Sequence, residues 1–226
     1  MSEATRVLAI RHGETAWNVD TRIQGQLDIG LNDVGQWQAS RLARALADEP
    51  ITAIYASDLG RAFETAQHVS RATGVPVTPT PGLRERHFGA FQGQTFAGIE
   101  AALPEQAMRW RTRDPEFAPE GGESLTQLRE RVVGTAQLLA AQHPGELIMM
   151  VGHGGVLDIL YRAATRLELQ APRTWALGNA AINRLLWTPD GLTLVGWADT
   201  QHLDEGSMDD DNGFAAGGAP KPLSTG

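Results

Sequence analysis

Apolar residues in this chain gather in short continuous runs, separated by segments with a helical period. The runs at 7–10, 51–56 and 147–151 have the length of buried strands. Helical patterns occupy 31–50, 57–73, 125–142 and 156–166. This alternation favours a mostly parallel sheet with crossover helices. We therefore predict an α/β fold, a three-layer α/β/α sandwich around a mostly parallel sheet.

Two segments break the alternation. Residues 91–119 hold two short helical patterns and no strand, which predicts a small helical cap excursion at about 86–122. Apolar segments at 180–187 and 192–197 flank Pro189-Asp190-Gly191, a combination typical of a C-terminal hairpin. We expect a single domain over 1–203, followed by an acidic, Gly- and Pro-rich flexible tail at 204–226.

Charge and composition restrict the function. The net charge is −8; the tail from Asp204 holds five acidic residues and one lysine, a net of −4, so the rest also carries −4. This balance argues against nucleic acid as a partner. The absence of cysteine excludes disulfides, Cys-ligated zinc and a thiol nucleophile. We find no signal-peptide pattern and no apolar run of membrane-spanning length, so we expect a cytoplasmic protein without membrane contact.

Polar residues follow two of the predicted strands at the point where each ends. Arg11-His12-Gly13 comes after the first strand, and Gly152-His153-Gly154 after the most hydrophobic one. The carboxyl ends of parallel strands share one edge, so both imidazoles can meet in one crevice. Arg61 falls in the first turn of a helix, where a bound anion would offset its unfavourable charge. We therefore predict that the side chains of Arg11, His12, Arg61 and His153 together form a phosphate cage.

Several further motifs occur in the same order as in one known family. They are Arg11-His12-Gly13-Glu14-Thr15 with Trp17-Asn18, Ile23-Gln24-Gly25, Leu31-Asn32-Asp33-Val34-Gly35, Ser57-Asp58-Leu59-Gly60-Arg61-Ala62, Leu83-Arg84-Glu85 and Gly152-His153-Gly154. Each is weak alone, and jointly they are specific. From residue 7 to about 203, the chain resembles the histidine phosphatase superfamily, the phosphoglycerate-mutase-like proteins.

The resemblance implies a mechanism that needs no metal and no cofactor. Neutral His12 would attack phosphorus and form a phosphohistidine. Arg11, Arg61 and His153 would stabilise the phosphoryl oxygens, and Glu85 would act as acid and then as base. Residues implied to bind phosphate or substrate are Asn18, Gln24, Gly25 and Gly154. Two alternatives stay open: Asn18 could cap a turn, and Glu85 could pair with Arg84 or Arg86.

The family contains hydrolases and mutases, and this chain has features of both. The segment 85–93 and Trp110-Arg111-Thr112-Arg113 resemble mutases, although Thr112 interrupts their paired arginines. Three features resemble hydrolases. The excursion is short, it is closed by Gly121-Gly122-Glu123-Ser124, and Gly155 stands where mutases generally carry Asn.

We therefore predict a phosphatase that hydrolyses a small phosphorylated metabolite through a phosphohistidine on His12. The alternatives are a 2,3-bisphosphoglycerate-dependent phosphoglycerate mutase, and a non-catalytic phosphate-binding or scaffold protein on the same fold. The identity of the substrate stays open. The oligomeric state also stays open, and a homodimer is one of the alternatives.

Overall fold

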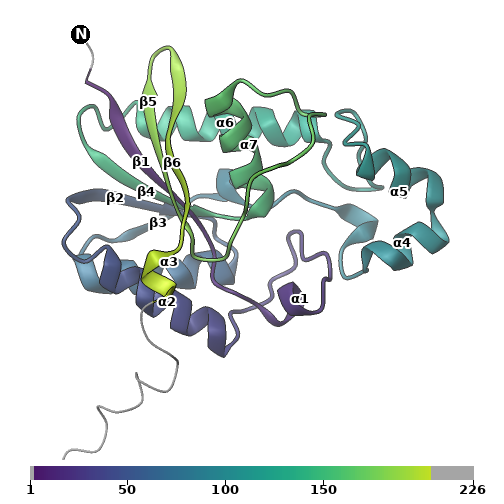
Figure 1. The fold of residues 1–226 in the computed structure, drawn as a ribbon, viewed down its shortest axis with the longest axis horizontal. Coiled ribbons are helices and arrows are strands. Elements are labelled where there is room, and N and C mark those ends of the chain that lie inside the picture. The colour runs from purple at the N-terminus through teal and green to yellow at the C-terminus, as the bar shows by residue number, and fades with distance from the viewer. Residues whose placement is uncertain (1–2, 205–226) are drawn as a thin grey trace, which may run out of the picture.

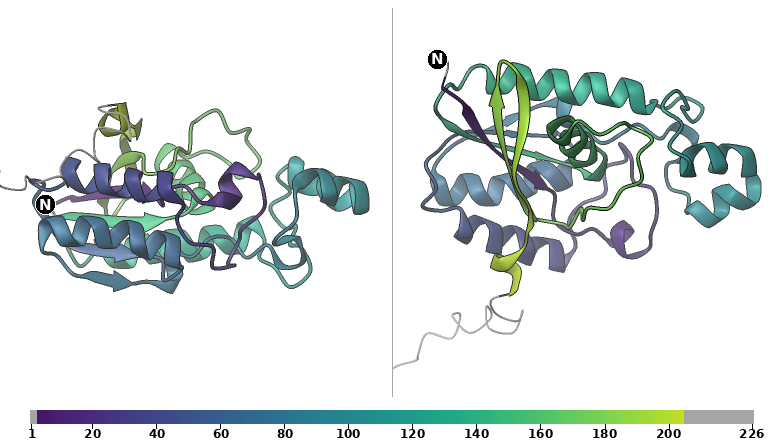
Figure 2. Two further views of the ribbon diagram at one scale, coloured as in Figure 1. Left: turned by 90° about the horizontal axis from the view of Figure 1, so that it is seen from below. Right: turned by 45° about the horizontal axis from the view of Figure 1, so that its top comes forward.

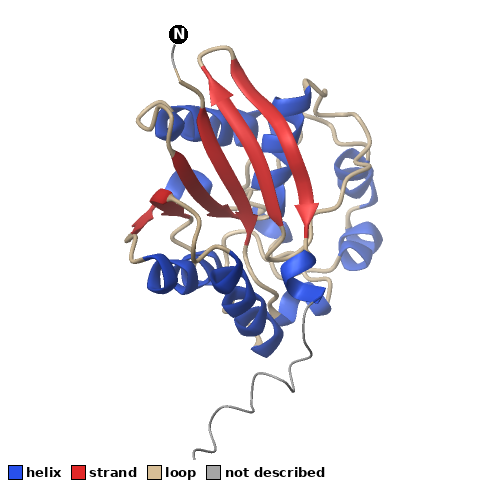
Figure 3. Ribbon diagram, turned by 60° about the vertical axis from the view of Figure 1, so that its left-hand side comes forward, coloured by secondary structure: helices blue, strands red, loops and turns tan. Residues whose placement is uncertain are grey.

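The computed structural model describes residues 3–204, and its centre is a six-stranded sheet in the order β3-β2-β4-β1-β5-β6 (Figures 1 and 3). The strands are β1 Thr5–Arg11, β2 Ile51–Ala56, β3 Val77–Pro79, β4 Leu147–Gly152, β5 Ile182–Thr188 and β6 Gly191–Asp199. Pairings among β3, β2, β4 and β1 are parallel, whereas β5 and β6 form an antiparallel hairpin beside β1. The predicted mostly parallel sheet and C-terminal hairpin are confirmed.

Helices cover both faces of this sheet (Figure 1). They are α1 Ala16–Val19, α2 Asp33–Ala45, α3 Gly60–Thr73, α4 Phe96–Ala102, α5 Pro104–Arg111, α6 Leu125–Ala140, α7 Gly154–Thr165 and α8 Gln201–Asp204. The α6 and α7 helices lie on one face, and α2 and α3 lie on the other, which confirms the three-layer α/β/α sandwich. None of the helices between residues 3 and 204 is both long and apolar enough to cross a membrane.

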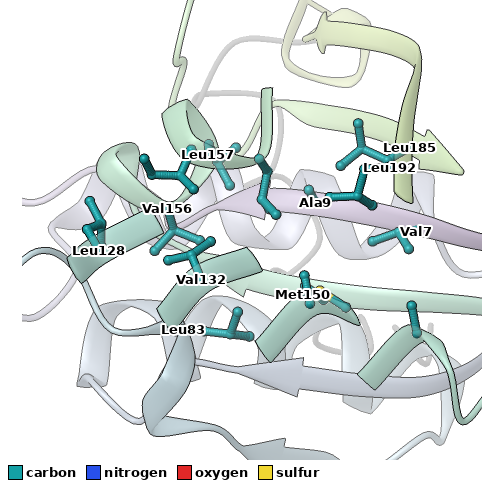
Figure 4. Packing of buried hydrophobic residues seen from close by; sticks show 14 of the residues in the cluster. Val7, Ala9, Leu83, Leu128, Val132, Met150, Val156, Leu157, Leu185 and Leu192 are labelled. Carbon is teal, nitrogen blue, oxygen red and sulfur yellow. The ribbon is translucent and has the colours of Figure 1, made fainter. Parts of the chain in front are cut away.

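The central strands are buried on both faces, which explains their continuous apolar runs. On β1, Val7 and Ala9 pack in the cluster beneath α6 and α7 (Figure 4), whereas Leu8 and Ile10 pack against α2 and α3. Successive side chains of a strand point to opposite faces, so a strand between two helical layers needs apolar residues at every position.

The cap stands beside the sheet and has a small core of its own (Figure 2). Phe91, Ile99, Ala107 and Phe117 are buried together there, and Trp110 stacks on Phe91 with ring centroids 5.5 Å apart. The cap contains α4 and α5 and no named strand, as its two helical patterns predict.

Three local features differ from the sequence predictions or extend them. The helical pattern at 57–73 predicts that Ser57 and Asp58 begin the helix, but α3 begins at Gly60, whose backbone N–H donates to Asp28 Oδ1 at 2.7 Å. That cap comes from a distant loop, which helical periodicity does not reveal. The short α8 helix was not predicted. Only Asp204 of the predicted flexible tail is described, and the remainder of 204–226 lies outside the described residues.

Candidate active site

Two histidines meet at the carboxyl edge of the sheet. His12 follows β1 and His153 follows β4, and the parallel pairing of these strands sets Arg11 opposite Gly152. The two imidazole centroids lie 5.1 Å apart, and the residues are 3% and 0% exposed. The structure thus brings together the two side chains that strand position predicts to meet.

The ring of His12 is oriented by its neighbour. Its Nδ1 lies 2.6 Å from the carbonyl oxygen of Gly13. A carbonyl can only accept a hydrogen bond, so Nδ1 carries the proton and Nε2 keeps its lone pair. Burial, and then the charges of Arg11 and Arg61, hold the pKa of His12 well below its usual value. At neutral pH this histidine is therefore uncharged and has a nucleophilic nitrogen.

Two glycines allow the loop after His12 to pack against the start of α2. A Cβ on Gly13 would lie within 3.0 Å of the Gly35 carbonyl oxygen, and a Cβ on Gly35 would lie within 3.0 Å of Glu14 backbone atoms. The backbone N–H of Gly13 also donates to Thr65 Oγ1 at 3.0 Å. The motif Leu31-Asn32-Asp33-Val34-Gly35 is thus part of the support for His12.

Two buried arginines flank the histidines. Arg61 is 1% exposed and donates from Nη1 to the Leu27 carbonyl at 2.8 Å and from Nη2 to the Gly25 carbonyl at 2.7 Å. Burial lowers its pKa to about 10. Arg11 donates from Nη1 to the carbonyl of Leu177. Backbone carbonyls therefore orient both guanidinium groups without neutralising their charge.

His153 has one partnered and one unpartnered ring nitrogen. Its Nε2 lies 2.9 Å from Ser57 Oγ, and burial, followed by the charge of Arg61, holds its pKa well below the usual value. Within residues 3–204, its Nδ1 is buried without a hydrogen-bond partner, as are Arg11 Nε and Arg61 Nε. Buried polar atoms normally have partners, so this cluster is typical of a site that a polar ligand completes.

Glu85 is fixed by backbone groups. Its Oε2 accepts from the N–H of Gly155 at 3.0 Å, and its Oε1 accepts from the N–H of Arg86 at 2.7 Å. It does not pair with Arg84, which forms an ion pair with Asp58. A Cβ on Gly155 would lie within 3.0 Å of Glu85 Oε1, so the carboxylate occupies space that any other residue at 155 would need.

The remaining predicted residues have mainly supporting positions. Asn18 lines the site, and its Oδ1 accepts from the Thr15 N–H at 3.0 Å, so it also caps α1. Gln24 is 9% exposed and lines the site, and Gly25 adopts a positive φ of 52° and holds Arg61 through its carbonyl. Gly154 is the first residue of α7, and its Cβ would lie 3.8 Å from Arg11 Nε, an ordinary contact.

A cavity of about 190 Å³ joins most of these groups. Its lining includes Arg11, His12, Asn18, Gln24, Gly25, Arg61 and Glu85. Sequence reasoning missed Arg22 and Phe88 in this lining, although Arg22 directly precedes the Ile23-Gln24-Gly25 motif. It also missed Asn179, whose Nδ2 donates to the His12 carbonyl at 2.8 Å and for which no sequence signal exists.

The part of the chain that the structure describes contains no cluster of metal-ligating side chains. Among residues 3–204, no group of three or more His, Cys, Asp or Glu side chains is arranged to hold a metal ion. The cavity beside His12 is instead lined by arginines, which recognise phosphate and carboxylate oxygens through a planar fork of N–H donors.

Comparisons with known proteins agree with this geometry. Residues 7–200 match the histidine phosphatase superfamily (branch 1). The chain is 38% identical over 203 residues to phosphoglycerate mutase-like protein 4 of Arabidopsis thaliana, covering 88% of this chain and 87% of that protein. It is 37% identical over 205 residues to the metal-independent phosphoserine phosphatase of the same plant, covering 89% and 84%.

The fold also matches solved structures. The structure of a mycobacterial glucosyl-3-phosphoglycerate phosphatase superposes with a TM-score of 0.77 at 33% identity, covering 86% of this chain and 99% of that one. The family match over residues 7–200 includes strands of the sheet, both helical layers and the motifs around His12 and His153. The chain belongs to the histidine phosphatase superfamily.

Proposed function

We propose that this protein is a phosphatase that hydrolyses small phosphomonoesters through a phosphohistidine on His12. The observation that carries the proposal is the set of buried, unpartnered nitrogens around a neutral imidazole: Arg11 Nε, Arg61 Nε and His153 Nδ1. A phosphoryl group would supply oxygens to these positions, and preorganised donors stabilise the charge that develops during its transfer.

The proposed reaction has two steps. In the first, His12 Nε2 attacks phosphorus; the N–P bond forms, the P–O ester bond breaks, and Glu85 donates its proton to the leaving alkoxide. In the second, the Glu85 carboxylate takes a proton from water as the water oxygen attacks phosphorus. The N–P bond breaks, orthophosphate leaves, and His12 is again neutral.

Hydrolysis is favoured over transfer to a second alcohol by Gly155. Mutases of this family generally carry Asn at this position, and here a Cβ would collide with the Glu85 carboxylate. The relatives named as phosphatases support the same choice. Incubation with 3-phosphoglycerate and a trace of 2,3-bisphosphoglycerate separates the two activities. We expect free phosphate; accumulation of 2-phosphoglycerate without it would identify a mutase.

The test of the mechanism is His12→Ala. We expect turnover of 4-nitrophenyl phosphate to fall by at least about 10³-fold, because the nucleophile is lost, and no acid-labile phosphoenzyme to form. EDTA should leave wild-type activity unchanged. His68→Asn serves as the control and should keep activity and phosphoenzyme, because this half-buried histidine of α3 contacts Gln36 and does not line the cavity beside His12. An active His12→Ala protein would exclude this mechanism.

A further inference from the structure

The carbonyl of Gly25 that holds Arg61 belongs to a peptide group with a second partner. This carbonyl accepts from Arg61 Nη2 at 2.7 Å, and the N–H of the same peptide group, which is that of Gln26, donates to Gln92 Oε1 at 2.8 Å. The carbonyl and the N–H of a trans peptide group lie in one plane and point in opposite directions. The side chain of Gln92 therefore determines the direction in which the Gly25 carbonyl points.

The backbone of Gly25 makes this peptide group easy to turn. Its φ of 52° lies in the left-handed region, which a glycine adopts about as readily as the right-handed one. A Cβ at this position would lie within 3.0 Å of Gln92 Oε1, so Gln92 packs directly against the Gly25 backbone. Because glycine imposes little conformational preference, the orientation of the peptide group depends on this contact and on its two hydrogen bonds.

Gln92 is itself held in place at the base of the cap. It follows Phe91, which is fully buried in the cap core. On its other side, the N–H of Gly93 donates to the carbonyl of Ile23 at 2.8 Å, which joins the cap to the loop just before Gly25. The Gln92 side chain therefore reaches the peptide group from a backbone that is already ordered, so forming its hydrogen bond costs less entropy.

The guanidinium of Arg61 depends on this peptide group for its orientation. Its Nη1 donates to the carbonyl of Leu27 at 2.8 Å, and its Nη2 donates to the carbonyl of Gly25. Within residues 3–204 its Nε is buried without a partner. When both Nη atoms are held, the direction of Nε is fixed, and a donor fixed in advance stabilises a phosphoryl oxygen better than one that must reorient.

We propose that Gln92 is a positioning residue of the phosphate site, which orients Arg61 through the peptide group between Gly25 and Gln26. The proposal rests on the proposed function, in which Arg61 binds the phosphoryl group. Gln92 is not among the residues that line the cavity beside His12, so its effect on the substrate is transmitted by Arg61. A residue of the cap base thus contributes to phosphate binding without touching the phosphate.

Binding of inorganic phosphate, measured by calorimetry, tests this role without relying on turnover. Gln92→Leu removes the acceptor from a side chain of similar size, and we expect phosphate affinity to fall about tenfold, because a hydrogen bond that orients a charged group is lost. Gln92→Glu keeps an oxygen that can accept from the Gln26 N–H and should bind within about threefold of wild type. The matched control is Gln94→Leu, whose wild-type side chain donates to the Ala90 carbonyl inside the cap; its affinity should change by less than about twofold.

A double-mutant cycle separates the positioning of Arg61 from general damage to the site. With Arg61 present, Gln92→Leu should lower kcat/KM for 4-nitrophenyl phosphate about tenfold; in an Arg61→Ala background it should lower it by less than about twofold. The role of Gln92 is refuted by equal losses in the two backgrounds, by unchanged phosphate affinity in Gln92→Leu, or by a failure of Gln92→Glu to restore binding.

The same variants distinguish this proposal from the proposed function. If the wild-type protein hydrolyses no phosphomonoester, but Gln92→Leu weakens phosphate binding and Gln92→Glu restores it, the phosphatase function fails and the role of Gln92 stands. If the wild-type protein hydrolyses phosphomonoesters and Gln92→Leu binds phosphate as tightly as wild type, the role of Gln92 fails and the function stands.

Discussion

Because Gly155 has no side chain, the carboxylate of Glu85 can lie directly against its backbone. Gly155→Ala places a Cβ within 3.0 Å of Glu85 Oε1 and must displace it. We expect kcat to fall by about 10- to 100-fold, because a shift of about 1 Å in a catalytic group has such effects. Stability should change by less than about 1 kcal/mol, since the displaced atom ends a flexible side chain.

The measurements are steady-state kinetics and urea unfolding of the same protein. Gly134→Ala is the matched control, because a Cβ at this helical position meets no atom within 4 Å. It should keep kcat and gain up to about 1 kcal/mol of stability. Unchanged kcat in Gly155→Ala would show that the position of Glu85 is not critical.

The proposed proton transfer from Glu85 should matter more for a poor leaving group than for a good one. Glu85→Gln should lower kcat/KM for an alkyl phosphate by about 10²-fold or more, because the alkoxide then leaves unprotonated. For 4-nitrophenyl phosphate, whose leaving group is stable as an anion, the loss should stay below about fivefold. The comparison of the two substrates is the measurement. An equal loss with both would contradict an acid role.

Single residues differ in how far the sequence predicts their placement. His12 and His153 are placed by the ends of continuous apolar strands, a local signal that survives folding. Asn179 comes from the irregular segment between α7 and β5, which reaches the site through tertiary packing. No periodicity describes such a segment, so the sequence does not predict its position.

Between elements, a buried ion-pair group connects the cap to α7. Arg113 follows α5, adopts a positive φ of 55°, and pairs with Asp158, which also pairs with Arg162. Asp158→Asn leaves two cations without a counterion, one of them on Arg162, which is 2% exposed. We expect a loss of about 3 kcal/mol in the free energy of unfolding, measured in urea.

The control for this prediction is Asp199→Asn. Asp199 pairs with Arg184 at 2.7 Å, but the side chains are 31% and 40% exposed. An ion pair so open to solvent contributes little, so its loss should cost less than about 1 kcal/mol. Similar losses in the two variants would mean that burial of the Asp158 group adds nothing.

The elements themselves were mostly predictable. The strands at 51–56 and 147–152 and the helix at 125–140, with its Ser124 cap, follow from local apolar runs and capping residues. The start of α3 does not follow from local sequence. The residue that caps it is Asp28, which lies in the loop before α2, 32 residues earlier in the sequence. Contacts between segments distant in sequence leave no periodic signal.

For the whole molecule, the buried histidines make stability depend on pH. Their pKa values are held well below the usual value when folded, whereas the unfolded chain takes up protons near pH 6.5. Below that pH the unfolded state binds more protons, so the free energy of unfolding falls as pH falls. Each histidine should contribute a loss of up to about 1.4 kcal/mol between pH 7.5 and 5.5.

Urea unfolding at these two pH values checks the prediction. In His12→Asn the loss between them should be smaller, by up to about 1.4 kcal/mol, because one buried neutral histidine is gone. His68 and His202, whose pKa values are also lowered by burial, are present in both proteins and cancel in the comparison. An identical pH dependence in the two proteins would show that folding does not lower the pKa of His12.

The order of the strands has a consequence for synthesis on the ribosome. Among the described strands β1 is synthesised first and ends at Arg11, yet its two partners are β4, which starts at Leu147, and β5, which starts at Ile182. At a synthesis rate of about 5–20 residues per second, roughly ten seconds or more pass between the synthesis of β1 and that of β4, its first partner. Throughout that interval Val7-Leu8-Ala9-Ile10 lacks both strands that pair with it in the folded protein, so this apolar segment is exposed to aggregation until β4 is made.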